Sequence, residues 1–442
     1  MSARQIFAAA AFALVAFVPQ FANAVDVKVV PAAKGEEVWF VEDHTVPIVA
    51  MSAAIPAGSA YDPQGKDGLS AMAAALLDEG AGKMNSDAYH TALDDKAIQL
   101  SVSPSRDYAV IRIVTLAENA KEAFQLLGLA LAHPRFDADA IQRIRAQMIE
   151  SIKQDEQEPA TVAGKEFTRR FFPGHPYGHP VSGDINTLST ITQNDLRQFA
   201  RTHWVRGGLK IAVSGDINEA TLKTLLGAAF DAIPATKPPA PPNVTRLGSP
   251  GIHVVPMPVP QPTVEFGLPG ILRADKDFIP AYVANYILGG GGFSSQLMKE
   301  VREKRGLTYG IDTDLNTYSK AGVFVGQVAT KKNSVKQTID VIRQVMSNFA
   351  EKGATASELT DAKTYLTGSY PLAFDSNTGI AAQLNAFQRV GLSSDYITKR
   401  NDMIEAVTLD DIKRVAKRLF NPAKMTIVVG GSFSDGKSPA AH

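Results

Sequence analysis

Ile191-Thr192-Gln193-Asn194-Asp195-Leu196 and, 216 residues later, Val407-Thr408-Leu409-Asp410-Asp411-Ile412 share one pattern. In each copy a threonine precedes a helix-like stretch, and its hydroxyl can accept a hydrogen bond from a free amide of the first helical turn. An apolar strand pattern follows each helix, at 209–215 and 425–431. The chain is therefore predicted to be a duplication.

The beginnings of the two halves correspond as well. An apolar strand at 48–55 leads to an alanine-rich helix after Gly68, and a strand at 263–269 leads to a helix at 279–288. Strands next to runs of helices, without regular βαβ alternation, favour an α+β fold with two homologous domains, each a mainly antiparallel sheet packed with helices. The predicted division is a leader at 1–24, a first domain at 25–235, a proline-rich linker at 236–250, a second domain at 251–434 and a flexible tail at 435–442.

Composition excludes several classes of function. None of the 442 residues is cysteine, so disulfides, thiolate metal sites and cysteine nucleophiles are excluded. Lys+Arg and Asp+Glu both number 45, which gives no electrostatic reason to expect a nucleic-acid or anionic-membrane partner.

Residues 1–24 have the features of a cleaved signal peptide. Arg4 is followed by an apolar run at 6–18, and Ala22-Asn23-Ala24 is a small-x-small cleavage site. A membrane anchor would need about 20 apolar residues. We expect export to the periplasm, with the mature chain beginning near Val25.

Three longer segments, in order, carry a family likeness: Gly68-Leu-Ser-Ala-Met-Ala-Ala-Ala-Leu-Leu-Asp-Glu-Gly-Ala81, Phe172-Pro-Gly-His-Pro-Tyr-Gly-His-Pro-Val-Ser-Gly183 and Leu288-Gly-Gly-Gly-Gly-Phe-Ser-Ser-Gln-Leu-Met-Lys-Glu-Val-Arg-Glu-Lys-Arg-Gly-Leu-Thr-Tyr309. Together they resemble the mitochondrial-processing-peptidase-like branch of the pitrilysin/insulinase family of zinc metallopeptidases. The resemblance covers nearly all of the mature chain. It implies two related domains that form half of a clamshell around a closed chamber.

The first segment resembles the family's zinc-binding helix without its catalytic side chains. The two His positions of its H-x-x-E-H motif fall on Ala71 and Ala75, the Glu falls on Ala74, and the third ligand position falls on Ser151. Glu150 is one position away, on another face of its helix. The resemblance therefore implies that this chain binds no zinc and is inert alone. His175 and His179 are four apart, but the prolines after them prevent a helical register, and only a loop metal site stays open as an alternative.

The third segment keeps the family's other catalytic pair, Arg302 and Tyr309. The resemblance implies that these two side chains act in trans at the zinc site of a partner, with Gly306 between them ending a helix so that Tyr309 enters a following strand. It also implies that a loop of Gly289, Gly290, Gly291, Gly292 and Phe293 contacts substrate. A hinge between helices is the alternative for the glycines.

These features predict a non-zinc subunit of a heterodimeric exported metallopeptidase, whose zinc lies in a homologous partner with an intact H-x-x-E-H helix and whose substrates are peptides. The alternative is a catalytically inactive peptide-binding or assembly subunit, in which the chain has no part in proteolysis and can self-associate.

Overall fold

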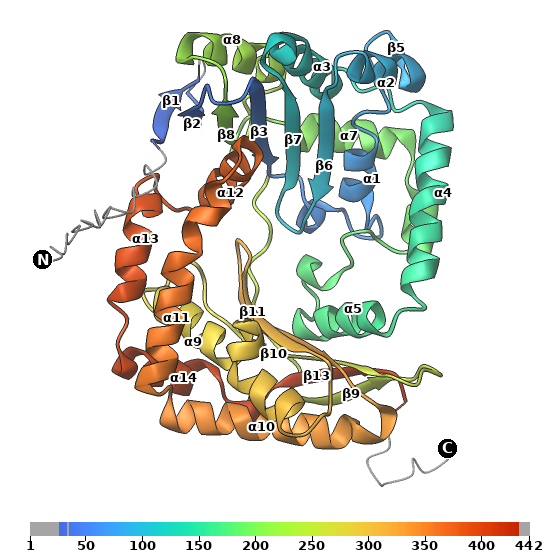
Figure 1. The fold of residues 1–442 in the computed structure, drawn as a ribbon. Helices are drawn as coiled ribbons and strands as arrows, with labels where there is room; N and C mark the ends of the chain where they lie inside the picture. The colour runs from blue at the N-terminus through green and yellow to red at the C-terminus, as the bar shows by residue number, and fades with distance from the viewer. Residues whose placement is uncertain (1–25, 33–34, 433–442) are drawn as a thin grey trace, which may run out of the picture.

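The computed structural model describes residues 26–32 and 35–432 (Figure 1). The predicted signal peptide at 1–24 and the predicted flexible tail at 435–442 lie outside the described residues. Within those residues, every helix is too short or too polar to pass through a bilayer.

Six described strands form the first sheet, in the order β1-β2-β8-β3-β7-β6. All neighbouring pairs in it are antiparallel except β2 and β8. The strands are β1 Lys28–Pro31, β2 Glu37–Glu42, β3 Ile48–Ile55, β6 Gln99–Pro104, β7 Ala109–Leu116 and β8 Lys210–Gly215.

Five described strands form the second sheet, in the order β11-β12-β10-β13-β9. Here the parallel pair is β13 with β9. The strands are β9 Gly251–Val255, β10 Thr263–Pro269, β11 Ile311–Thr317, β12 Gly322–Ala329 and β13 Thr426–Gly430. The order β2-β8-β3-β7-β6 of the first sheet is repeated as β9-β13-β10-β12-β11, so the predicted duplication and the predicted α+β fold are confirmed.

The duplicated threonines begin corresponding helices, α7 Gln193–His203 and α14 Leu409–Leu419, and each forms a capping box with an aspartate three residues later. Two short strands, β4 Gly80–Ala81 and β5 Met84–Asn85, pair beside the first sheet. The other α-helices are α1 Leu69–Ala75, α2 Ser86–Asp94, α3 Ala120–Ala132, α4 Ala138–Asp155, α5 Pro159–Phe171, α6 Ile185–Thr190, α8 Glu219–Phe230, α9 Phe278–Asn285, α10 Val335–Lys352, α11 Ala356–Gly368, α12 Asn377–Arg389 and α13 Tyr396–Glu405.

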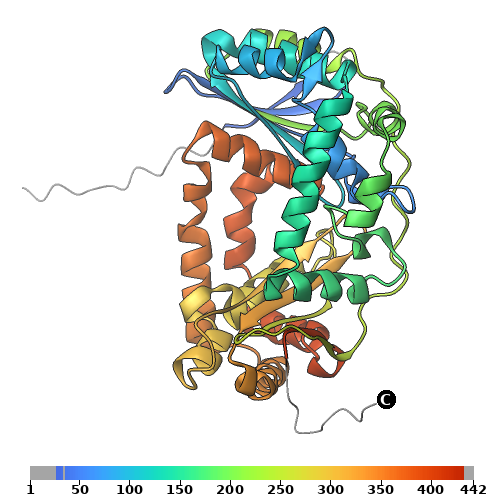
Figure 2. The ribbon, with the colours of Figure 1, turned by 90° about the vertical axis from the view of Figure 1, so that its right-hand side faces the viewer.

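Each repeat lends one helix to the sheet of the other repeat (Figures 1 and 2). The α5 helix of the first repeat packs on β10 and β13, and the α12 helix of the second repeat packs on β3 and β8. At one contact, the Asn385 amide donates to the Lys210 carbonyl at 2.9 Å. Because helices cover both faces of the sheet, seven of the eight residues of β3 are buried, and its sequence is apolar except for Ser52 rather than alternating.

The segment between the sheets, 236–250, contains neither helix nor strand, as its prolines predict. It is nevertheless bound to both repeats. One ring nitrogen of His175 lies 2.9 Å from the Pro242 carbonyl, and the Ser249 amide donates to the Thr426 hydroxyl at 2.8 Å.

Candidate functional site

The N-terminal end of the degenerate helix α1 is stabilised by a left-handed glycine and a carboxylate. Gly68 precedes it in the left-handed conformation, with φ of 92°, which favours glycine. The Asp62 carboxylate accepts hydrogen bonds from the amides of Gly68 and Ser70, both at 2.8 Å. These bonds satisfy free amides at the helix start. The helical frame is therefore intact although the ligand side chains are absent.

The alanines of α1 border an open cleft of about 530 Å³. Ala71 and Ala75 line it, together with Met148 and Asp155 of α4, while Ala74 is buried. Three methyl groups offer a metal no lone pair, and zinc sites use nitrogen, sulfur or carboxylate oxygen ligands. The residues present at the predicted zinc positions therefore do not fit zinc.

The predicted third ligand position is also unsuited to a metal. Ser151 is exposed on α4. Its neighbour Glu150 has a side chain 60% exposed, and the carboxylate lies 3.7 Å from the Lys153 ammonium, as expected of a solvated helix residue.

His175 and His179 do not form a joint site. The two ring nitrogens of His175 are used, one by the Pro242 carbonyl and one by the Tyr177 amide at 3.0 Å. His179 contacts a different residue, because its Nδ1 lies 2.7 Å from the Asp67 carboxylate. Each histidine therefore fixes a different part of the surrounding loops.

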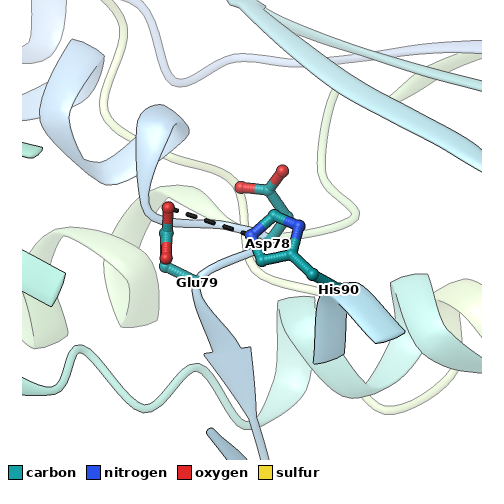
Figure 3. Close-up of side chains that lie close together, drawn as sticks. All are labelled: Asp78, Glu79 and His90. Carbon is teal, nitrogen blue, oxygen red and sulfur yellow. Dashed lines mark ion pairs between the residues drawn. The ribbon is translucent and has the colours of Figure 1, made fainter. Parts of the chain in front are cut away.

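Sequence reasoning missed one cluster with metal-binding residue types. Asp78, Glu79 and His90 bring ligand atoms within 4.8 Å of one another, just beyond α1 (Figure 3). Arg143, however, donates to both Glu79 oxygens at 2.9 and 2.7 Å and lowers the pKa of that carboxyl. Ser86 donates to the same group at 2.5 Å. With its oxygens occupied by a guanidinium, Glu79 serves to connect α2 with α4.

Arg302 and Tyr309 lie on one short segment before β11. Arg302 is in a π-helical turn, Met298–Glu303, and its guanidinium lies 4.7 Å from the centroid of the Phe293 ring. Gly306 has φ of 61° and ends this helix, and its amide donates to the Arg302 carbonyl at 2.9 Å. Tyr309 precedes the start of β11 by two residues rather than lying in the strand, and its side chain is 87% exposed.

The four glycines before Arg302 have different surroundings. Gly289 is buried, and a Cβ there would lie 2.3 Å from the Thr313 hydroxyl on β11, so this glycine permits close packing of helix on strand. A Cβ on Gly290 would lie 2.8 Å from the Asn285 amide nitrogen, and one on Gly291 would lie 2.7 Å from the Tyr286 carbonyl. Gly292 has φ of 56° and is exposed, next to Phe293, which is 64% exposed. The exposed end of the loop is thus the part that can contact a ligand.

Comparisons with known proteins agree with this geometry. A family model described as "Insulinase (Peptidase family M16)" matches residues 37–185, and one described as "Peptidase M16 inactive domain" matches residues 190–366. A Helicobacter pylori protein described as "Non-peptidase homolog YmxG" is 27% identical over 386 residues, which are 86% of this chain and 88% of that protein.

Solved structures give the same result. A crystal structure of a peptidase M16 inactive domain from Pseudomonas fluorescens is similar with a TM-score of 0.87 and 28% identity, over 92% of this chain and 98% of the other. The structure of a protease from Helicobacter pylori shares the fold, with a TM-score of 0.82 and 17% identity over 91% and 99% of the two chains.

Proposed function

The chain belongs to the insulinase (peptidase M16) family as a member whose α1 helix lacks the zinc ligands and the general base. From this premise we propose that it is the non-zinc subunit of a heterodimeric exported metallopeptidase. Its partner carries an intact H-x-x-E-H helix and the zinc. The observation that carries the proposal is the contrast between an α1 helix without metal-binding side chains and a segment that keeps both Arg302, which is partly exposed, and Tyr309, which is exposed.

The chemistry assigned to this chain is electrostatic. Peptide hydrolysis passes through a tetrahedral species with a negatively charged oxygen, and a phenol O–H donor placed beside it lowers the barrier. Tyr309 is 87% exposed, which leaves its phenol free to contact a facing subunit. The Arg302 guanidinium, oriented by the Phe293 ring, can hold a substrate carbonyl or carboxylate in its planar fork.

Substrate binding is assigned to the Gly292–Phe293 loop end and to a sheet edge. The β6 strand lies at the edge of the first sheet, and its residues Val102 and Pro104 line the cleft of α1. A free strand edge can pair with an extended peptide through main-chain hydrogen bonds. The two subunits would then close around the peptide as a clamshell.

Export to the periplasm belongs to the same proposal. It is supported by the signal-peptide pattern at 1–24 and by the absence of cysteine. Determining the amino-terminal residue of the protein recovered from the periplasmic fraction tests it, with Val25 expected first.

The deciding experiment measures cleavage of an unstructured peptide mixture by the full chain, by its H-x-x-E-H homologue and by both together. We expect activity only from the mixture, and loss of it with a chelator. Tyr309→Phe should reduce kcat at least roughly tenfold, or about 1.4 kcal/mol of transition-state stabilisation.

Two control substitutions match the pair. Tyr365→Phe alters another exposed tyrosine, one that stacks on Tyr286, and Arg305→Gln alters an arginine paired with Glu300. Both should leave the activity of the mixture unchanged, whereas Arg302→Gln should reduce it. Full activity of the homologue alone, or an unaffected Tyr309→Phe mixture, would refute catalysis in trans.

The second candidate is a catalytically inactive peptide-binding or assembly subunit. The description of the Helicobacter pylori relative as a non-peptidase homologue favours it. Self-association of the purified chain, measured by light scattering, together with an inactive mixture, is the result that would support this function instead.

A further inference from the structure

A second cleft, of about 660 Å³, lies where the two repeats meet. Its walls come from the β6–β7 turn, the β11–β12 turn, the segment after β10 and the end of α12. In Figure 1 the β11–β12 hairpin rises toward the first sheet. The two turns are joined directly, because the Asp107 carboxylate accepts a hydrogen bond from the Ser319 amide at 2.9 Å.

Three arginines line this cleft, and the contacts of two of them are with a carbonyl and an aromatic ring rather than with a carboxylate. Arg106 donates from Nε to the Tyr177 carbonyl at 3.1 Å. The Arg273 guanidinium lies 4.9 Å from the centroid of the Tyr396 ring. Arg389 is half-buried, and its Nε is buried without a hydrogen-bond partner. Within the described residues, none of these three guanidinium groups forms an ion pair.

The cleft therefore has an excess of positive charge. Asp107 is the acidic residue in its lining, and that carboxylate is already engaged by the Tyr177 phenol at 2.5 Å and by the Ser319 amide. Burial lowers the pKa of Arg273 and that of Arg389, and the opposing effects of Tyr396 on Arg273 and of Tyr108 and Asp107 on Arg389 offset this only in part. A bound anion would supply further compensation.

We propose that this cleft binds the carboxylate of an extended peptide, with Arg389 and Arg106 as its principal contacts. A guanidinium fork matches the two oxygens of a carboxylate, and the exposed Leu272 and the partly buried Val181 give the adjoining chain an apolar wall. The cleft is continuous with the degenerate α1 cleft, since Pro104, Arg106 and Val181 line both. The inference rests on the peptide-binding part of the proposed function and not on catalysis in trans.

Binding is tested on the full chain alone, by fluorescence anisotropy of a labelled alanine–leucine peptide. The peptide is prepared with a free C-terminal carboxylate, with a C-terminal amide, and as the amide with one internal glutamate. We expect a carboxylate-bearing form to bind at least roughly tenfold more tightly than the plain amide, since a hydrogen bond to a charged group contributes that much. The free terminus and the internal glutamate separate the two possible sources of the carboxylate.

Substitutions locate the site. Arg389→Gln and Arg106→Gln should each weaken binding of the preferred peptide at least roughly tenfold, and Arg389→Lys should retain part of the affinity. Arg305→Gln is the control, because Arg305 is an arginine that pairs with Glu300 and does not line the cleft. Thermal unfolding of every variant separates loss of binding from loss of folding.

Equal binding of the amide and carboxylate peptides, or normal binding by the folded Arg389→Gln and Arg106→Gln variants, would overturn the proposal. So would displacement by inorganic phosphate without any preference among the peptides, which would indicate a general anion site. If the Tyr309→Phe variant leaves the activity of the mixture unchanged while the chain still binds carboxylate peptides selectively, only the proposal of catalysis in trans fails. If Tyr309→Phe lowers the activity but binding shows no preference for the carboxylate, only the proposed carboxylate site fails.

Discussion

Glu265, in the centre of the second sheet, is one residue through which pH should act on stability. It lies on β10 beside Gln327, whose amide donates to the carboxyl group at 2.9 Å, and Asp312 is next to Gln327 on the far side. Burial, and to a smaller extent the Asp312 charge, raises the pKa of Glu265 to about 7. The folded state therefore binds this proton more tightly than the unfolded chain does.

It follows that the stability contributed by Glu265 is fully present below its usual pKa of 4.5 and is lost as the pH rises through about 7. Denaturant unfolding between pH about 6.5 and about 8 should show stability falling with pH, by about 1 kcal/mol from this group. Below about pH 6.5, His203 acts in the opposite direction, because burial lowers its pKa to about 4. Glu265→Gln should make the free energy of unfolding depend less steeply on pH. Some dependence should persist, because the pKa of Asp62 is also raised to about 7. Glu300→Gln, at an exposed ion pair, should not flatten it; equal slopes in Glu265→Gln and the unmodified chain would contradict the assignment.

At the residue scale, metal binding could be predicted from the sequence wherever the residue type alone decides whether a ligand atom is present. Alanine at 71, 74 and 75 cannot bind a metal in any fold, so the loss of the ligand atoms could be read directly. The contacts of Glu79 with Arg143, and the meeting of Arg106 with Arg389, could not be read. Both involve residues far apart in the chain: folding of the first repeat brings Glu79 to Arg143, and packing of the two repeats brings Arg106 to the cleft that Arg389 also lines.

At the scale of elements, the capping boxes of α7 and α14 explain why these helix starts were predictable. Thr192 and Thr408 each accept a hydrogen bond from the amide three residues on, at 3.2 and 3.1 Å, so the signal lies entirely within four residues. The helix predicted at 279–288 was less accurate. The α-helix ends at Asn285 and continues as a π-helix over Tyr286–Gly290, in which Gly289 packs closely on Thr313 of β11.

Removing the N-cap hydroxyl of either helix should lower the stability of the protein by a similar, moderate amount. Thr192→Ala and Thr408→Ala are each expected to lower the free energy of unfolding by about 1 kcal/mol, since an amide of the first turn loses its acceptor. Thr192→Ser and Thr408→Ser keep the hydroxyl and should restore most of it. Chemical denaturation of the four variants measures the effect, and a loss in the serine variants equal to that in the alanine variants would show that the methyl group, not the cap, matters.

At the scale of the molecule, the exchange of α5 and α12 makes the two repeats one folding unit. The sequence pattern did not predict this exchange, because an apolar helix face does not specify which sheet it covers. Phe167 and Phe171 of α5 are buried in a cluster that includes Val323 and Val428 of the second sheet. Ser214 of β8 lies 2.5 Å from the Asn377 amide oxygen of α12. The division of the chain at 235 and 251 therefore separates the two sheets but not the helices that cover them.

This arrangement predicts that neither half folds well alone. Residues 25–235 would expose the α5 face and the bare side of β3 and β8, and each phenylalanine left in water costs about 2 kcal/mol. We expect the separate halves, 25–235 and 251–442, to aggregate or to melt far below the full chain. When coexpressed they should co-purify, because each restores the other's missing helix. A full chain cut at an inserted protease site within 236–243 is the control, and it should stay assembled and melt close to the uncut chain. Cooperative unfolding of an isolated half at the temperature of the full chain would mean that the exchanged helices contribute little to stability.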